Sequence, residues 1–95
     1  MDFLLDAGFS EDLVNKIRQK YEESILDIVR LDQENVLEVI NYFQEIGINK
    51  VDQLLLSHIE IFTKDIEEVK KAFQRYNLGE IVEKINKDIS VIDYI

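Results

Sequence analysis

The fold is decided by the stretch Asn41–Ile66, which reads NYFQEIGINKVDQLLLSHIEIFTKDI. It predicts, in order, the end of a helix, a stop at Gly47, a short second helix, a tight apolar turn and the start of a third helix. Similar parts recur on both sides of this stretch. The sequence therefore predicts an all-α protein built as a short stack of one helical unit.

The composition fits one small helical domain. The chain has 95 residues, no proline and three glycines, and 46% of its residues are hydrophobic while 33% are charged. That balance is typical of a folded domain, and helices tolerate a shortage of turn residues better than sheets do. A chain of this length buries about 60–65% of its unfolded surface, which allows a small core.

A shift of thirty residues overlays the chain on itself. The apolar stripe and a Phe-Gln pair of one unit fall on those of the next: Val36, Val39, Phe43, Gln44 and Ile46 fall on Ile66, Val69, Phe73, Gln74 and Tyr76. Amphipathic helices always overlay to some extent, but the shared helix breakers favour a real repeat. We expect a right- or left-handed stack of about two and a half helix-helix-turn units, since such units bury their apolar faces on neighbours. Their approximate bounds would be 1–31, 32–62 and 63–95, in a single compact domain.

The thirty-residue alignment predicts the conformation or burial of individual residues. Gly8 and Gly47 should take positive φ after a helix, and so should Asn77, which falls on Gly47 after the shift. Phe43 and Phe73 should occupy equivalent buried positions. The side chains of the next helix expected to point inward are Ile66, Val69, Phe73 and Tyr76. The residues expected to cap helices are Ser10, Asp32, Asn49 and Thr63.

Gly8-Phe9-Ser10, Gly47-Ile48-Asn49 and the segment from Leu54 to Phe62 repeat a pattern of leucine spacing plus a glycine. This pattern, together with the long helices predicted between its copies, resembles the repeat of the mitochondrial transcription termination factor family over nearly the whole chain. The resemblance implies a helical-repeat fold. Members that bind nucleic acid carry basic residues along a groove, whereas this chain is acidic. The family usually has a proline in the apolar turn, where this chain has Glu22 and Ile59.

A second family offers a rival interpretation. Ala7-Gly8-Phe9 and the run NVLEVINYF from Asn35 to Phe43 resemble parts of the ubiquitin-associated three-helix domain. The gap between them is longer than that domain allows.

The charge is negative and unevenly distributed. Net charge is −9: residues 1–48 hold eleven acids and four bases, a charge of −7, and residues 49–95 hold nine acids and seven bases, a charge of −2. Acidic chains are repelled by phosphate backbones and anionic lipid. Because no apolar run approaches the roughly 20 residues of a membrane helix, we expect no membrane partner and a cytoplasmic location.

No stretch predicts catalysis, a cofactor or a metal. The chain lacks cysteine, which excludes disulfides and thiolate metal sites. His58 is the only histidine, and a catalytic triad would also need an orienting acid and an oxyanion site. We interpret His58 as a loop or capping group, and we expect a non-enzymatic protein.

Charged stripes supply the candidate binding residues. Glu34, Glu38, Asn41 and Glu45 share one helical face, and the positions thirty residues later are Lys64, Glu68, Lys71 and Arg75. If the two helices lie side by side, these stripes would form a ladder of surface ion pairs, which is the interpretation we favour. In the other interpretation, Lys64, Lys70, Lys71 and Arg75 form an anion-binding patch.

Two functional hypotheses follow. The first is an acidic helical interaction module that binds the basic surface of another protein, with Glu34, Glu38 and Glu45 as contact residues. The alternative is a nucleic-acid-binding helical repeat that uses Lys64, Lys70, Lys71 and Arg75.

Overall fold

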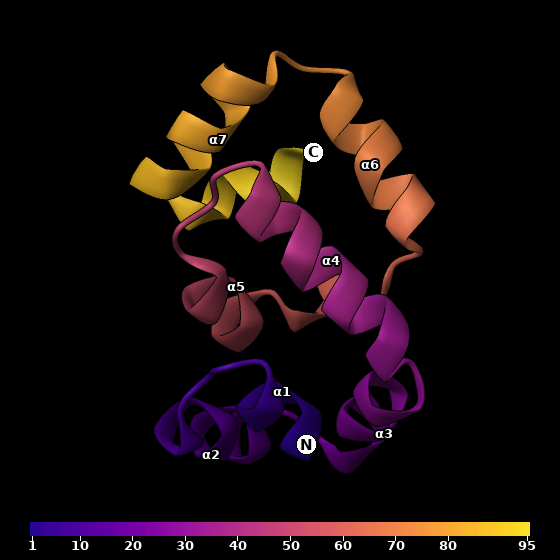
Figure 1. The fold of residues 1–95 in the computed structure, drawn as a ribbon. Helices are drawn as coiled ribbons and strands as arrows, with labels where there is room; N and C mark the ends of the chain where they lie inside the picture. The colour runs from indigo at the N-terminus through magenta and orange to yellow at the C-terminus, as the bar shows by residue number, and fades with distance from the viewer.

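The computed structural model describes residues 1–95 and contains helices and no strands, which confirms the all-α prediction (Figure 1). There are seven α-helices and two 3-10 helices. The α-helices are α1 (Asp2–Asp6), α2 (Glu11–Lys20), α3 (Glu23–Leu31), α4 (Gln33–Glu45), α5 (Val51–Ser57), α6 (Ile66–Gln74) and α7 (Leu78–Lys87). The 3-10 helices are η1 (Ile59–Thr63) and η2 (Ile89–Tyr94).

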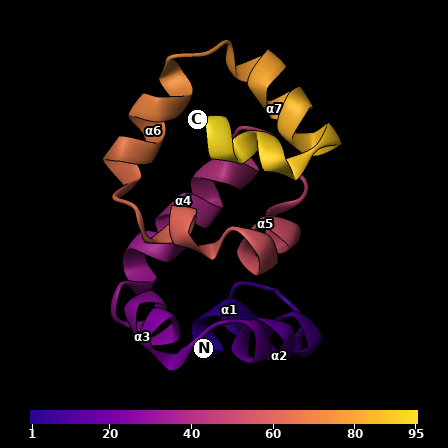
Figure 2. The same ribbon diagram turned by 180° about the vertical axis from the view of Figure 1, so that it is seen from behind.

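The first three helices and the last two α-helices lie at opposite ends of the molecule, and α4 runs between them. Figures 1 and 2 show α1, α2 and α3 at the N-terminal end, α4 rising through the centre, and α6 and α7 at the opposite end. Helix α2 packs on α5, α4 packs on both η1 and α6, and α7 packs on η2. The radius of gyration is 12.8 Å, close to the roughly 12 Å expected for a compact domain of this length.

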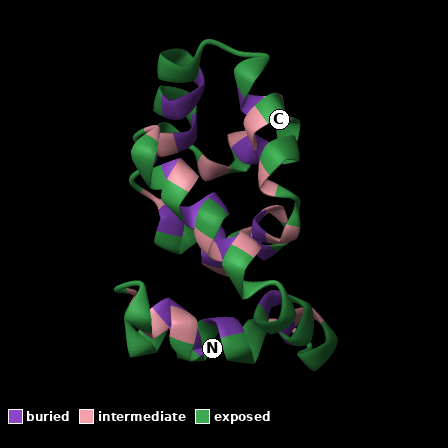
Figure 3. Ribbon diagram, turned by 45° about the vertical axis from the view of Figure 1, so that its right-hand side comes forward, coloured by how far each residue is buried: buried purple, intermediate pink, exposed green.

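The core is entirely apolar. All 22 buried residues are hydrophobic and no polar side chain is buried among them. Figure 3 shows these positions on the sides of the helices that face their neighbours. Phe43 of α4 lies at the centre of an aromatic cluster, with its ring centroid 5.4 Å from those of both Phe62 and Phe73. Phe43 and Phe73 have no exposed surface, which confirms that both are buried.

Two helix stops follow the prediction. Gly8 and Gly47 both have φ of +101°. After α4, the Gly47 amide donates to the Gln44 carbonyl and the Ile48 amide donates to the Phe43 carbonyl. This pair of bonds is the Schellman arrangement, which satisfies the last carbonyls of a helix and favours glycine at the left-handed position. The same pair of bonds closes α1 at Gly8.

The prediction for Asn77 is wrong. Its φ is −68°, and its side chain caps the start of α7 by accepting a hydrogen bond from the Glu80 amide at 3.1 Å. Asparagine is favoured both after a helix and at a helix N-cap. Helix α6 ends at Gln74, so Asn77 belongs to the following helix.

Two of the four predicted caps are also wrong. Ser10 caps α2, accepting from the Leu13 amide at 3.1 Å, and Asp32 precedes α4 without a side-chain cap bond. Asp65, and not Thr63, caps α6, while Thr63 belongs to η1. Asn49 does not cap α5 either, because Lys50 is the residue before that helix.

Tyr76 was expected to point inward and is 43% exposed. Its hydroxyl donates to the Tyr94 carbonyl at 3.1 Å, which links the end of α6 to η2. The expectation failed because Tyr76 lies beyond the last turn of α6 and so leaves the helical stripe.

Some boundaries recur at the thirty-residue spacing. Helix η1 begins at Ile59 and η2 at Ile89, and α5 ends at Ser57 where α7 ends at Lys87. Helices α4 and α6 differ in length, with 13 and 9 residues. The repeat and its three unit boundaries stay predictions.

None of the helices combines the length and the apolar character that crossing a membrane requires. The cytoplasmic location stays a prediction.

Replacing Phe43 by alanine should lower the free energy of unfolding by about 3–5 kcal/mol, since it empties the centre of the aromatic cluster. Phe43→Leu should cost less and keep the fold measurable. Urea unfolding would give both values, with Tyr94→Ala as the control because Tyr94 is 81% exposed. A loss below about 1 kcal/mol for Phe43→Ala would contradict the central position of this ring.

Gly47→Ala should cost roughly 1 kcal/mol or more, because a β-carbon is disfavoured at positive φ. The added carbon would lie 3.6 Å from Val82 Cγ1, an ordinary contact, so the cost comes from the backbone. Gly47→Asn should cost less. Gly79→Ala, inside α7, should stabilise by roughly 0.4–1 kcal/mol. Thermal unfolding of the three variants would refute this explanation if Gly47→Ala proved as stable as Gly79→Ala.

Candidate functional site

The predicted acidic residues lie exposed on α4. Glu34, Glu38 and Glu45 have no cation within 4.0 Å. The ion pairs of the chain are elsewhere: Lys16–Asp12, Arg30–Glu23, Arg30–Asp27, Lys87–Glu83 and the His58–Asp93 contact. The predicted ladder of ion pairs between α4 and α6 is therefore wrong, although these two helices pack against each other.

The predicted basic residues do not form a single helical stripe. Lys70 and Lys71 lie on α6, and Arg75 is the residue that follows its last turn. Lys64 lies before α6, in extended backbone with φ of −73° and ψ of 149°. Lys64 therefore lies outside the helix, whereas Glu34, its counterpart thirty residues earlier, lies within α4.

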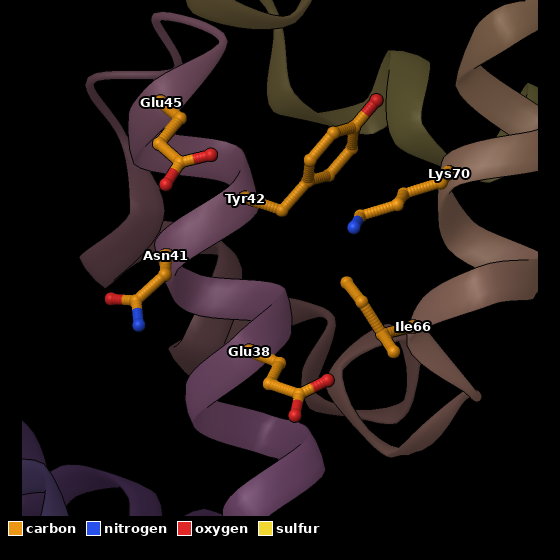
Figure 4. A pocket seen from close by; sticks show the side chains of 6 residues that line it. All are labelled: Glu38, Asn41, Tyr42, Glu45, Ile66 and Lys70. Carbon is orange, nitrogen blue, oxygen red and sulfur yellow. The ribbon is translucent and has the colours of Figure 1, made fainter.

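A shallow hollow lies between α4 and α6 and brings some of the predicted residues together. Its volume is about 210 Å³. Helix α4 supplies one wall and α6 the other, and the residues that line the hollow are Glu38, Asn41, Tyr42, Glu45, Ile66 and Lys70 (Figure 4). We call this hollow the α4–α6 groove. It contains two of the three predicted acidic residues and one of the four predicted basic residues.

Tyr42 is the aromatic side chain of the groove, and it is held by the core. Its ring meets Phe73 edge to face, with centroids 6.0 Å apart and planes at 89°, and lies 6.3 Å from the ring of Phe43. Lys70 Nζ lies 5.8 Å from the Tyr42 ring centroid, within reach of a cation–π interaction. Partial burial raises the pKa of the Tyr42 phenol, because the charged form is disfavoured away from water.

Asn35 fixes the position of α6 relative to α4. Its side-chain amide donates to the carbonyls of Lys64 at 2.6 Å and Phe62 at 3.4 Å, and its oxygen accepts from the Ile66 amide at 3.0 Å. One side chain of α4 thus satisfies the backbone on both sides of the turn that leads into α6. The two walls of the groove are tied together at this end.

His58 has the orienting acid that the sequence did not reveal. Its Nδ1 lies 3.1 Å from Asp93 Oδ1, so the contact joins the start of η1 to η2. The His58 side chain contacts Asp93 and forms no hydrogen bond with a hydroxyl group that could act as a nucleophile. Of the two interpretations of His58, as a loop group or a capping group, its position between α5 and η1 agrees with the first, and its side chain makes no capping hydrogen bond.

The chain contains no group of three or more histidine, cysteine, aspartate or glutamate side chains placed to hold a metal ion. Comparison of the chain with protein-family models, with curated proteins and with solved structures gives no match. The resemblance to the transcription termination factor family therefore stays a prediction.

Sequence reasoning missed the aromatic and apolar parts of the groove, Tyr42 and Ile66. A signal for Tyr42 was present, because it follows Glu38 by four residues and so lies next to it on the helix surface. Ile66 was expected to point inward and is half-buried at the start of α6.

Asn35→Ala should lower the free energy of unfolding by about 1–3 kcal/mol, since it leaves partly buried backbone groups without partners. Asn41→Ala, on the same helix but exposed, should change it by less than about 0.5 kcal/mol. Chemical denaturation of both variants tests this. Equal effects would contradict the role of Asn35 in joining α4 to α6.

Proposed function

We propose that this protein is a non-enzymatic interaction module that binds the basic surface of another protein through the acidic side of α4 and the α4–α6 groove. The observation that supports this most is the absence of internal cation partners for Glu34, Glu38 and Glu45. The neighbouring helix α6 carries Lys70 and Lys71, and neither lysine forms an ion pair with these acids. These carboxylates stay available to an external cation.

The charge distribution supports the same proposal. The first half of the chain carries −7 of the total of −9, and α4 belongs to that half. A surface of one sign attracts an oppositely charged partner over a Debye length and raises the rate of association. A partner with a basic surface fits this field.

The size of the groove favours a protein side chain over a small molecule. Its volume of about 210 Å³ is below the roughly 300–1,000 Å³ of pockets that enclose small-molecule ligands. Its two walls are α-helices that pack against each other and share the core. A shallow, preformed groove of this kind suits one or two side chains of a larger partner.

Nucleic-acid binding is the second candidate, and one observation favours it. Lys71 and Arg75 are exposed and, like the acids of α4, have no ion-pair partner. With Lys64 and Lys70 they could contact phosphates. A gel-shift series at low salt tests this, because such binding weakens steeply with salt. No shift at tens of micromolar protein would exclude it.

A partner captured from native lysate should lose affinity when the three acids of α4 are neutralised together. We expect the triple variant Glu34→Gln, Glu38→Gln and Glu45→Gln to raise Kd by roughly three- to a hundredfold at low salt, because each lost charge contact is worth about 0.2–1 kcal/mol. Calorimetry or surface plasmon resonance with the purified partner would give the values.

The matched control removes three other charges from the acidic half of the chain. Its substitutions are at exposed residues without ion pairs on the first two helices and their following turn: Asp6→Asn, Glu11→Gln and Glu22→Gln. This control should change Kd less than the α4 variant does. Equal weakening by both variants would show that net charge alone drives binding and would overturn the assignment to α4.

A further inference from the structure

The α4–α6 groove already holds a cation over an aromatic ring. Lys70 Nζ lies 5.8 Å from the centroid of Tyr42 and forms no ion pair, although Glu38 and Glu45 line the same hollow. Figure 4 shows the Lys70 side chain reaching across from α6 toward the space between Tyr42 and Ile66. The groove therefore combines an aromatic face, flanking carboxylates and a cation that only the ring holds.

We propose that this groove is an arginine-binding site: an arginine of the partner protein stacks on the Tyr42 ring in place of Lys70 and pairs with Glu38. This rests on the proposed function and specifies which side chain of the partner is recognised. In Figure 4 the Glu38 carboxylate is turned toward Ile66, on the side of α4 that faces α6. Glu38 lies one helical turn before Tyr42 and lines the same groove, so its carboxylate is the neighbouring acid that a guanidinium over the ring would pair with.

The Tyr42 ring is prepared for stacking by its contacts with the core. Phe73 meets it edge to face, and Phe43 lies against it at 46°. These contacts fix the ring before a partner arrives, which reduces the entropy lost on binding. Glu38, Tyr42 and Glu45 follow one another at spacings of four and three residues, so they share one side of α4.

The chemistry of the groove favours arginine over lysine. A guanidinium is planar and weakly hydrated, so it can stack on an aromatic face while its edge donates two hydrogen bonds to a carboxylate. An ammonium group acts as a compact point charge and keeps its water more strongly. The occupant of the groove is therefore expected to be an arginine-bearing segment of a protein.

Lys70 competes with this occupant, and its replacement gives the sharpest test. Removing the internal cation frees the ring and removes a like charge, so Lys70→Gln should tighten binding of an arginine-rich ligand. If the groove instead bound phosphate groups, the same substitution would remove a contact and weaken binding. The sign of the change separates a cationic ligand from an anionic one.

The experiment measures binding of fluorescein-labelled nona-arginine and nona-lysine to the full chain at low salt by fluorescence anisotropy. The wild-type protein should bind nona-arginine about tenfold more tightly than nona-lysine, and Lys70→Gln should tighten nona-arginine binding severalfold. Tyr42→Leu should abolish the preference for arginine, while Tyr42→Phe, which keeps an aromatic ring, should retain this preference. Circular dichroism checks that each variant is folded, and Lys70→Gln needs no change to the core.

Equal affinity for the two peptides in the wild-type protein, or weaker nona-arginine binding by Lys70→Gln, would overturn the arginine site. The proposed function would survive that result if both peptides still depended on Glu34, Glu38 and Glu45. Failure of both peptides to bind the wild-type protein would overturn the arginine site and the basic-surface proposal together.

Discussion

The contact of the Phe43 ring with Phe62 and Phe73 is the interaction on which the rest of the structure depends. It joins α4 to η1 and to α6, the two consecutive elements that follow α5, and all three rings are fully buried. A chain of this length has a small core, so one aromatic cluster supplies a large share of the apolar contacts between its elements. Helix α4 ends at Glu45, and the Schellman stop at Gly47 turns the chain so that it returns to this cluster through α5 and η1.

The groove is a consequence of the same cluster. Tyr42 neighbours Phe43 on α4, and its ring lies against both Phe43 and Phe73 while one side stays open to Lys70. Asn35 ties the turn before α6 to α4 by three hydrogen bonds. The spacing of the two helices is therefore set by core packing and by backbone bonds. Because no ion pair links the helices, the acidic side chains of α4 do not contribute to holding them together.

The sequence predicted the parts of the fold that depend on periodicity and on glycine. The apolar stripe of α4, the buried phenylalanines and positive φ at Gly8 and Gly47 are all present, because these signals have one strong structural solution. Asn77, Thr63 and Asn49 were misplaced because each residue type suits several positions around a helix end. The candidate site was harder to predict from the sequence than the fold. Glu38 and Lys70 could be named as candidates, but side-chain contacts between α4 and α6 depend on the rotation and start of each helix. Lys64, expected within the helix, lies two residues before α6 and so is not part of its surface stripe.

The most direct test of this account is a map of backbone amide shifts by NMR as nona-arginine is titrated into the protein. The account predicts that the largest shifts occur along α4 from residue 38 to 45 and in the first turns of α6 from residue 66 to 70. It also predicts that amides around the buried Phe62 move little, because the groove is formed before the ligand binds. Shifts concentrated on α2 or α7, with α4 unperturbed, would contradict the account.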